Sequence, residues 1–146
     1  MTAGPGPGQP AFSADHTPYE ALGGEAAVGQ LAKAFYETMD RNPAYAGIRE
    51  LHGADLSTAE EKFRQFLSGW LGGPQLYVQQ YGHPRLRMRH APFPIGESER
   101  DQWLACMAEA LDACDVRGPI RDFLDARFAH VADFMRNRAE GSGPSA

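Results

Sequence analysis

The stretch Tyr81-Gly-His-Pro-Arg-Leu-Arg-Met-Arg-His-Ala-Pro-Phe-Pro-Ile95 restricts the fold of this 146-residue chain more than any other segment. Pro92 and Pro94 disfavour the helical conformation at the residue before each of them. A short helix that carries Leu86 and His90 on one face is therefore expected to end just past His90. The imidazole would then face the core from the end of that helix. By periodicity alone, a hydrogen-bonded core histidine is a more common explanation than a metal ligand.

Longer helices are expected on both sides of this stretch, because apolar residues recur there at spacings of three and four. Ser57 and Glu60 have the spacing of a capping box, which predicts Ser57 as a helix N-cap. No alternating run is long enough for a good strand, so the predicted class is all-α. The expected helices cover residues 17–22, 24–41, 57–71, 97–115 and 119–138, and residues 72–96, with four prolines, are predicted to be a long ordered loop.

Length and composition predict one globular domain over residues 17–138. Hydrophobic residues make up 42% of the chain, and the formal net charge is −5. Residues 1–16 are rich in glycine and proline, so we expect a disordered tail there and a flexible tail over 139–146. The acidic balance argues against a nucleic-acid partner. No apolar run approaches about 18 residues, and the N-terminus does not resemble a signal peptide, so we expect a cytoplasmic protein with no membrane partner.

Common catalytic motifs are absent, and the cysteines and most histidines have ordinary structural explanations. Cys106 and Cys114 are eight residues apart on one apolar helix face, which indicates inert thiols and not a redox pair. His130 is expected at a helix boundary or surface. Only His83 and His90 are close in sequence, too few for a structural zinc site.

Two further features admit more than one interpretation. Tyr36 and Trp103 lie at helical spacings typical of a core, yet a buried hydroxyl or indole N–H needs a partner. If both face one cavity, they are donors directed at a ligand. Arg85, Arg87 and Arg89 form either a solvated face or a clamp for the carboxylates of a bound ligand.

Together with Gly72-Gly-Pro-Gln-Leu-Tyr77 and Glu99-Arg-Asp-Gln-Trp-Leu-Ala-Cys-Met107, the stretch 81–95 resembles the group II truncated haemoglobins. The resemblance extends over about residues 18–138. It implies a single-domain two-over-two globin fold with haem b between the helix pairs and a long ordered loop before the proximal helix. It also implies that His90 is the proximal ligand to iron, which replaces the interpretation of His90 as a plain core residue.

The same resemblance assigns roles to other positions. Tyr36 and Trp103 match the distal residues that hydrogen-bond a ligand, and Ala59 matches a distal position that often carries a small residue. His52 matches a third distal hydrogen-bonding position if the alignment before the helix at 57 is correct, and a shift of one residue would place Leu51 there. The remaining implied haem contacts are Lys62 and Arg89 with the propionates, and Phe63, Phe66, Leu67, Tyr77 and Met107 in the pocket.

These assignments predict binding of O2, NO, CO or a similar small ligand. Two hydrogen bonds to the ligand would slow its release, which favours O2 or NO chemistry or tight storage over bulk transport. With a reductase as partner, the protein would be a nitric oxide dioxygenase. One alternative is a peroxidase-like haem enzyme that uses Tyr36, Trp103 and His52, and another is a cofactor-free helical interaction module. A monomer and a homodimer are both compatible with the sequence.

Overall fold

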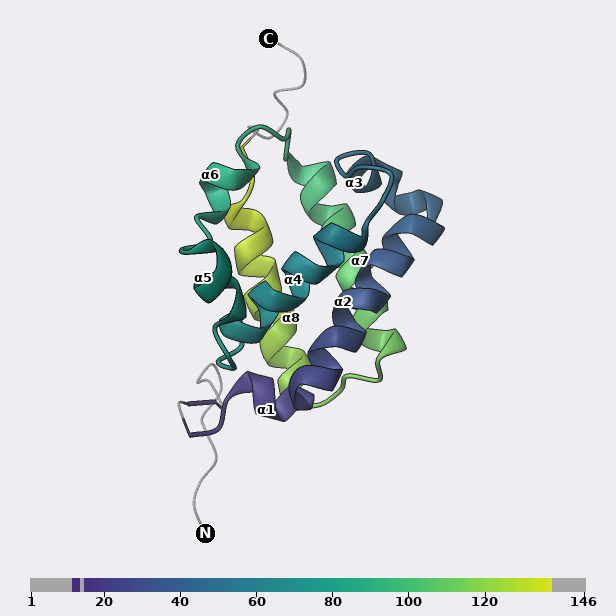
Figure 1. Ribbon diagram of the computed structural model, residues 1–146. Coiled ribbons are helices and arrows are strands. Elements are labelled where there is room, and N and C mark those ends of the chain that lie inside the picture. Colours follow the sequence, from purple (N-terminus) through teal and green to yellow (C-terminus); the bar gives the residue numbers. More distant parts are fainter. Residues whose placement is uncertain (1–11, 14, 138–146) are drawn as a thin grey trace.

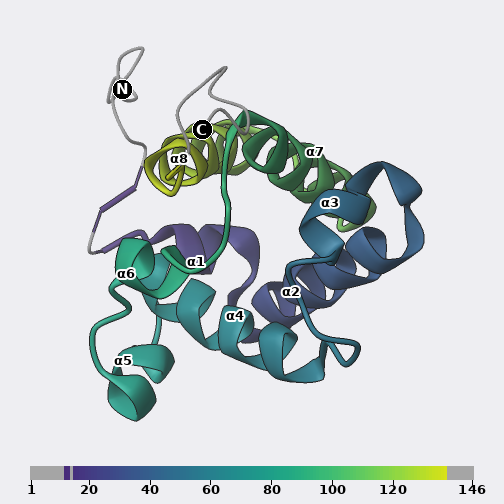
Figure 2. The same ribbon diagram turned by 90° about the horizontal axis from the view of Figure 1, so that it is seen from above.

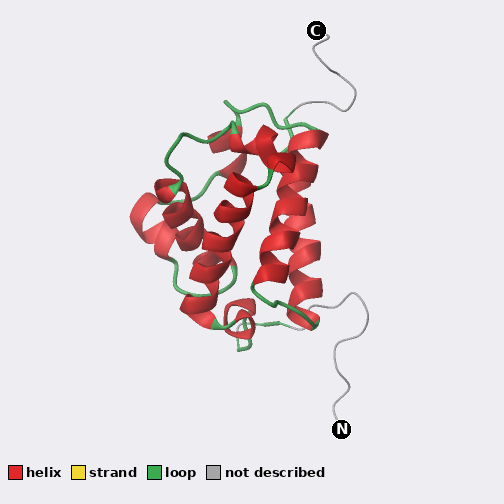
Figure 3. Ribbon diagram, turned by 90° about the vertical axis from the view of Figure 1, so that its right-hand side faces the viewer, coloured by secondary structure: helices red, strands yellow, loops and turns green. Residues whose placement is uncertain are grey.

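The computed structural model describes Phe12, Ser13 and residues 15–137, and this part of the chain is helical (Figure 3). It contains no strand there beyond an isolated bridge between Ser13 and His16. The all-α class is therefore confirmed. The helices are α1 (Pro18–Leu22), α2 (Gly24–Arg41), the 3-10 helix η1 (Pro43–Tyr45), α3 (Ala46–Arg49), α4 (Ser57–Trp70), α5 (Leu76–Tyr81), α6 (Leu86–His90), α7 (Glu97–Ala113) and α8 (Pro119–Phe134).

Four long helices form two layers (Figures 1 and 2). Helix α2 packs against α4 in one layer, α7 packs against α8 in the other, and α2 also contacts α7 across the layers. The short helices α5 and α6 lie along one edge of this arrangement. Among the described residues, no helix is both long enough and apolar enough to cross a membrane. The packing of α2 and α4 against α7 and α8 is the predicted two-over-two arrangement.

The core is built from the apolar faces that the helical spacing predicted. On α2, Val28, Leu31, Phe35 and Met39 are all almost completely buried. Each such side chain stabilises the fold by about 1.5–3 kcal/mol relative to an exposed position. The same buried cluster includes Leu71, the C-cap of α4, and residues within α4, α7 and α8, namely Leu67, Cys106, Met107, Ala110, Leu111, Leu124 and Phe128.

The predicted capping box at the start of α4 is wrong. Leu56 is the N-cap residue, and no side chain makes a capping hydrogen bond there. The Ser57 N–H instead donates to the Asp55 side chain over 2.9 Å. The Glu60 N–H donates to the Leu56 carbonyl over 2.9 Å, so the helix starts one residue earlier than a serine cap would allow, and Ser57 lies inside it.

The segment 72–96 contains a helix, α5, that the sequence did not indicate. Two side chains stabilise the turn before it: the Ser68 hydroxyl donates to the Pro74 carbonyl over 2.7 Å, and the Gln75 amide donates to the Gly69 carbonyl over 3.0 Å. A helix of six residues is too short to show a clear period. Helices η1 and α3 were missed for the same reason, and the short helix that ends at His90 is present as expected.

The helix and domain ends differ slightly from the predictions. Helix α7 ends at Ala113 instead of 115, and α8 ends at Phe134 instead of 138. The Phe12 ring lies edge-on to Phe123 at 4.9 Å. Contacts with the domain therefore begin before residue 17. Residues 1–11 and 138–146, which make up most of both predicted tails, lie outside the described residues.

Asn137, just after α8, fixes the chain that follows α6. Its side-chain oxygen accepts from the Ile95 N–H over 2.9 Å, and its amide nitrogen donates to the Phe93 carbonyl over 2.8 Å and to the His90 carbonyl over 3.3 Å. Its backbone N–H also donates to the Ile95 carbonyl over 2.8 Å. Asn137 therefore ties the end of α6 to the end of α8.

We expect Asn137→Ala to lower the free energy of unfolding by about 1–3 kcal/mol, because partly buried backbone groups at 90–95 lose their partners. Chemical denaturation followed by circular dichroism measures this change. Asn137→Asp is the matched control, since it keeps the acceptor for Ile95 but removes both donors, and its loss should be intermediate. An Asn137→Ala protein that unfolds at the same denaturant concentration as the unaltered protein would contradict this role.

Candidate functional site

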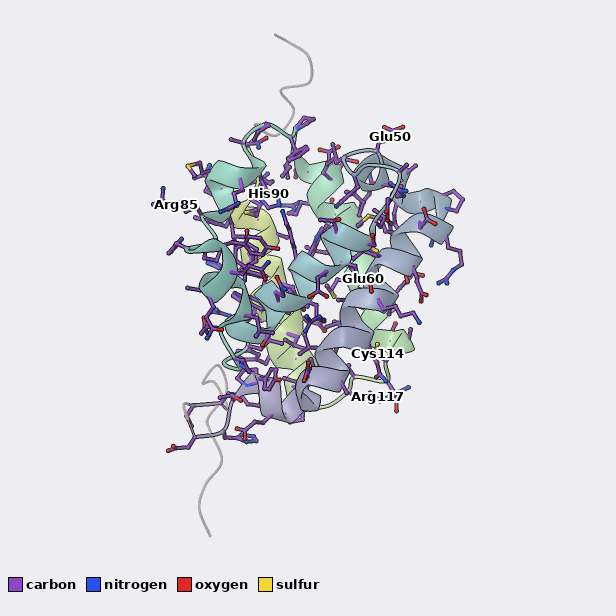
Figure 4. The ribbon with its side chains drawn as sticks, viewed as in Figure 1. Glu50, Glu60, Arg85, His90, Cys114 and Arg117 are labelled. Atoms are coloured by element: carbon purple, nitrogen blue, oxygen red, sulfur yellow. The ribbon has the colours of Figure 1, made fainter. Side chains whose placement is uncertain are left out.

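His90 is half-buried at the end of α6, and its orientation is fixed by its own helix. Its Nδ1 lies 2.7 Å from the Leu86 carbonyl oxygen. Because a carbonyl only accepts hydrogen bonds, Nδ1 is the donor, and in the neutral imidazole Nε2 is then the nitrogen whose lone pair can bind a metal. In Figure 4, His90 lies toward the inside of the molecule, whereas Arg85 at the start of the same helix lies at its edge.

The donor set around His90 fits haem better than a bare metal ion. Among the described residues, no group of three or more His, Cys, Asp or Glu side chains could hold an ion. A porphyrin brings four nitrogen ligands of its own, so one imidazole from the protein is enough.

An aromatic cluster joins α2, α4 and α7. The Phe35 ring centroid lies 5.1 Å from that of Tyr36, 5.3 Å from that of Phe63 and 5.2 Å from that of Trp103. Phe63 also meets Trp103 at 6.3 Å and Tyr36 at 5.9 Å. The structure therefore brings Tyr36, Phe63 and Trp103, which are far apart in the sequence, into one place.

The polar groups of this cluster are free to serve a ligand. In the part of the chain that the structure describes, no hydrogen bond involves the Tyr36 hydroxyl or the Trp103 indole N–H. Burial raises the pKa of the Tyr36 phenol well above its ordinary value, with smaller contributions from Cys106 and Glu60. The phenol therefore stays protonated at neutral pH and remains a donor.

His52 lies beside this cluster. Its ring meets Tyr36 edge-on at 5.6 Å, and its Nδ1 lies 2.9 Å from the Ile48 carbonyl oxygen. Burial lowers the pKa of His52, the hydrogen bond to Ile48 opposes this effect, and electrostatic interactions with Arg49 and His90 lower the pKa further. His52 therefore contacts Tyr36, and its role as a third distal hydrogen-bonding residue stays a prediction.

Two predicted rim cations are exposed and lie over aromatic rings. The Lys62 ammonium, on α4, lies 5.2 Å from the centroid of Tyr81, and the Arg89 guanidinium, on α6, lies 5.7 Å from the centroid of Tyr77. Neither cation forms an ion pair within the described residues. Their charges are thus available to an anionic ligand.

The other predicted pocket residues differ in their surroundings. Phe66 is half-buried and meets Tyr77, itself buried, at 6.3 Å. Ala59 is partly buried against the core. Leu67 and Met107 are almost completely buried within the core cluster, so their contact with a ligand remains a prediction. Asn137 belongs to no sequence motif that would have identified it, because it acts through backbone groups remote in sequence.

A small cavity of about 80 Å³ lies elsewhere, at the junction of α1, α2, α4 and α5. None of the predicted site residues lines it. Its lining residues are Tyr19, Glu25, Val28, Arg64, Ser68, Pro74 and Leu76.

The profile of the bacterial-like globins matches residues 17–137 of this sequence. The Group 2 truncated hemoglobin YjbI of Bacillus subtilis is 41% identical over 130 residues, which cover 89% of this chain and 96% of that protein. The chain therefore belongs to the bacterial-like globin family, within its group II truncated, two-on-two haemoglobins.

Solved structures agree with this assignment. The group II 2-on-2 haemoglobin of the plant pathogen Agrobacterium tumefaciens is similar with a TM-score of 0.81 and 46% identity, over 84% of this chain and 95% of that one. A truncated haemoglobin from Bacillus subtilis described as oxygen-avid is similar with a TM-score of 0.77 and 42% identity, over 83% of this chain and 99% of that one. The resemblance noted in the sequence is therefore confirmed at the level of the family and fold.

The lowered pKa of His52 predicts a pH dependence of stability. As the pH falls below 6.5, the ordinary value, the unfolded chain binds a proton at this residue before the folded chain does, so the free energy of unfolding decreases. We expect His52→Phe to reduce this decrease between about pH 7 and about pH 5. Denaturant unfolding at several pH values measures it, with His130→Ala, an exposed residue of α8, as the control. Identical pH profiles for His52→Phe and the unaltered protein would contradict the prediction.

Proposed function

We propose that this chain binds haem b through Nε2 of His90 and binds O2, NO or CO on the opposite side of the haem. The observation that carries this proposal is the hydrogen bond from Nδ1 of His90 to Leu86, because it leaves the other ring nitrogen as a basic, oriented ligand. Haem held by His90 would supply an iron able to bind a diatomic ligand. How the haem is held, and how long the ligand stays bound, would then depend on the side chains of this chain.

The chain offers suitable partners for the propionates and for the apolar faces of a haem. Lys62 and Arg89 come from two different helices and have no carboxylate partner within the described residues, so they suit the two propionates. The half-buried rings of Phe63 and Phe66 suit the apolar faces of the porphyrin. Family membership supports this assignment, since globins normally bind haem.

Tyr36 and Trp103 would control how long a diatomic ligand stays. Both are donors without a partner in the described part of the chain, and they belong to one aromatic cluster. A hydrogen bond to a partly charged acceptor contributes about 1.5–3 kcal/mol, which slows release by about one to two orders of magnitude for each bond. Slow release suits O2 or NO chemistry or tight storage better than bulk transport. The description of the Bacillus subtilis neighbour as oxygen-avid agrees with this inference.

A peroxidase-like activity is the second candidate, and it is supported by the position of His52. Its lowered pKa keeps the imidazole neutral at neutral pH, so it is able to accept a proton beside Tyr36. Steady-state turnover with hydrogen peroxide, compared between the unaltered protein and His52→Phe, separates this activity from simple ligand binding.

We expect His90→Gly to abolish the normal haem spectrum, because the cavity it leaves offers no axial ligand. The absorption spectrum of the purified ferrous protein and its haem content measure this loss. His130→Ala should retain the full spectrum. If His90→Gly stays equally coloured with an unchanged ferrous spectrum, His90 is not the ligand, and if the unaltered protein takes up no haem, the cofactor-free helical module is the correct alternative.

We expect Trp103→Phe to raise the O2 dissociation rate by roughly tenfold or more, since it removes the indole donor and keeps an aromatic ring. Tyr36→Phe should act in the same direction. Stopped-flow displacement of O2 by CO measures both rates. Trp70→Phe is the matched control: within the described residues Trp70 stacks on Phe128 at 5.1 Å and on Phe66 at 6.0 Å, and it makes no ring contact with Tyr36 or Trp103. A dissociation rate in Trp103→Phe equal to that of the unaltered protein would show that Trp103 is not a principal donor.

A further inference from the structure

The charges of this protein are strongly separated along the chain. Residues 62–96 contain five Lys or Arg residues and no Asp or Glu. The rest of the chain contains nine Lys or Arg and nineteen Asp or Glu residues, a formal net charge of −10. The basic segment includes α5 and α6, which lie along one edge of the molecule (Figure 1). An acidic protein thus presents one positive edge.

Of the five cations in this segment, only Arg64 forms ion pairs within the described chain, with Glu25 and Glu61. Elsewhere, Arg100 pairs with Glu97, Asp101 and Asp133, and Arg121 pairs with Asp112 and Asp125. By contrast, the described residues form no ion pair with four cations of the basic segment, namely Lys62, Arg85, Arg87 and Arg89. If Lys62 and Arg89 bind propionates, as proposed above, Arg85 and Arg87 still remain free.

Exposed apolar side chains lie around these arginines. Met88 is 60% exposed and Phe134 is 53% exposed, and Phe93 is also exposed. The Arg87 guanidinium lies 5.3 Å from the centroid of the Phe134 ring, which links α6 to the end of α8. The hydrogen bonds of Asn137 described above join the Phe93 segment to the same place. We call Arg85, Arg87, Met88, Phe93 and Phe134 the α6 surface.

The composition of the α6 surface indicates the kind of partner it fits. Arginine, methionine and aromatic residues are enriched at protein–protein interfaces, whereas lysine is depleted. A second copy of this chain would not pair through the same face, because arginines would oppose arginines. A protein that presents carboxylates around an apolar contact is complementary in both respects.

We propose that the α6 surface is the docking site of an acidic electron-donor protein. This inference rests on the proposed function, because a haem oxidised to the ferric state by O2 or NO chemistry needs one electron to bind O2 again. The donor loses one electron and the ferric iron gains it, and no bond forms or breaks. The α6 surface includes Arg87 and Met88 of the helix that carries His90, so a donor docked there lies near the proposed cofactor.

The test uses the haem-loaded protein and an acidic flavodoxin as the probe. Binding of oxidised flavodoxin is measured by calorimetry, without electron transfer, at low ionic strength and at about 0.2 M salt. The rate at which reduced flavodoxin reduces the ferric protein is then measured by stopped flow. The variants are Arg85→Glu and Arg87→Glu. The control is Arg117→Glu, which reverses an exposed arginine far from this segment in the sequence.

We expect saturable binding at low ionic strength that weakens with salt. Arg85→Glu and Arg87→Glu should each weaken binding and slow reduction by roughly tenfold, while Arg117→Glu changes neither by more than about twofold. Absence of binding at low ionic strength, or equal effects of all three reversals, overturns the proposal. The proposal is also overturned if the protein does not bind flavodoxin but binds phosphatidylserine vesicles or duplex DNA, and if this binding depends on Arg85 and Arg87.

Two controls separate a failure of this inference from a failure of the proposed function. Haem content and the CO difference spectrum are recorded for each variant, and neither should change. A protein without haem contradicts the proposed function, whereas the calorimetric result still decides whether the surface docks the probe. A protein that carries haem and binds CO normally, but shows no dependence on Arg85 or Arg87, contradicts the docking site alone.

Discussion

The hydrogen bond between His90 Nδ1 and the Leu86 carbonyl determines what the rest of this site does. It selects one tautomer, so the nitrogen that points away from the helix has a lone pair instead of a proton. Without that selection, the same side chain would often present an N–H to the interior and could not ligate a metal. Pro92 and Pro94 follow directly, so α6 ends just past His90 and the imidazole lies at the end of the helix, within reach of the carbonyl one turn earlier.

A helix of five residues does not hold itself in place, so the position of His90 depends on contacts made elsewhere. Asn137 bonds the backbone just after α6 from the far end of α8, and Ile95 is buried at the same junction. The layer of α7 and α8 thereby determines where the imidazole lies relative to α4, which carries Phe63 and Phe66. The ring orientation of His90 is thus set locally, whereas its place in the fold depends on a contact between residues separated by more than forty positions in the sequence.

Sequence patterns predicted the parts of this structure that depend on local periodicity. The apolar face of α2, from Val28 to Met39, needs only spacings of three and four, and those residues are buried as predicted. Helix α5 and the start of α4 depend on individual hydrogen bonds from Gln75, Ser68 and Asp55, which no period encodes. For the site, the contacts among Tyr36, Phe63 and Trp103 depend on how three helices pack. Periodicity alone favoured a structural role for His90, and only the resemblance to a family over a longer stretch favoured a ligand.

The absence of Asp and Glu from residues 62–96 explains both the cations of the proposed cofactor rim and the exposed positive edge. A carboxylate between residues 62 and 96 would compete with an anionic ligand for Lys62 or Arg89 and would pair with them in its absence, so the segment that surrounds such a ligand works best without acidic residues. An edge free of carboxylates also leaves Arg85 and Arg87 without partners, and their repulsion is tolerated because both are exposed to water. The attraction for an anionic group inside the molecule and the attraction for an acidic surface outside it therefore follow from one property of the sequence, the absence of Asp and Glu around α5 and α6.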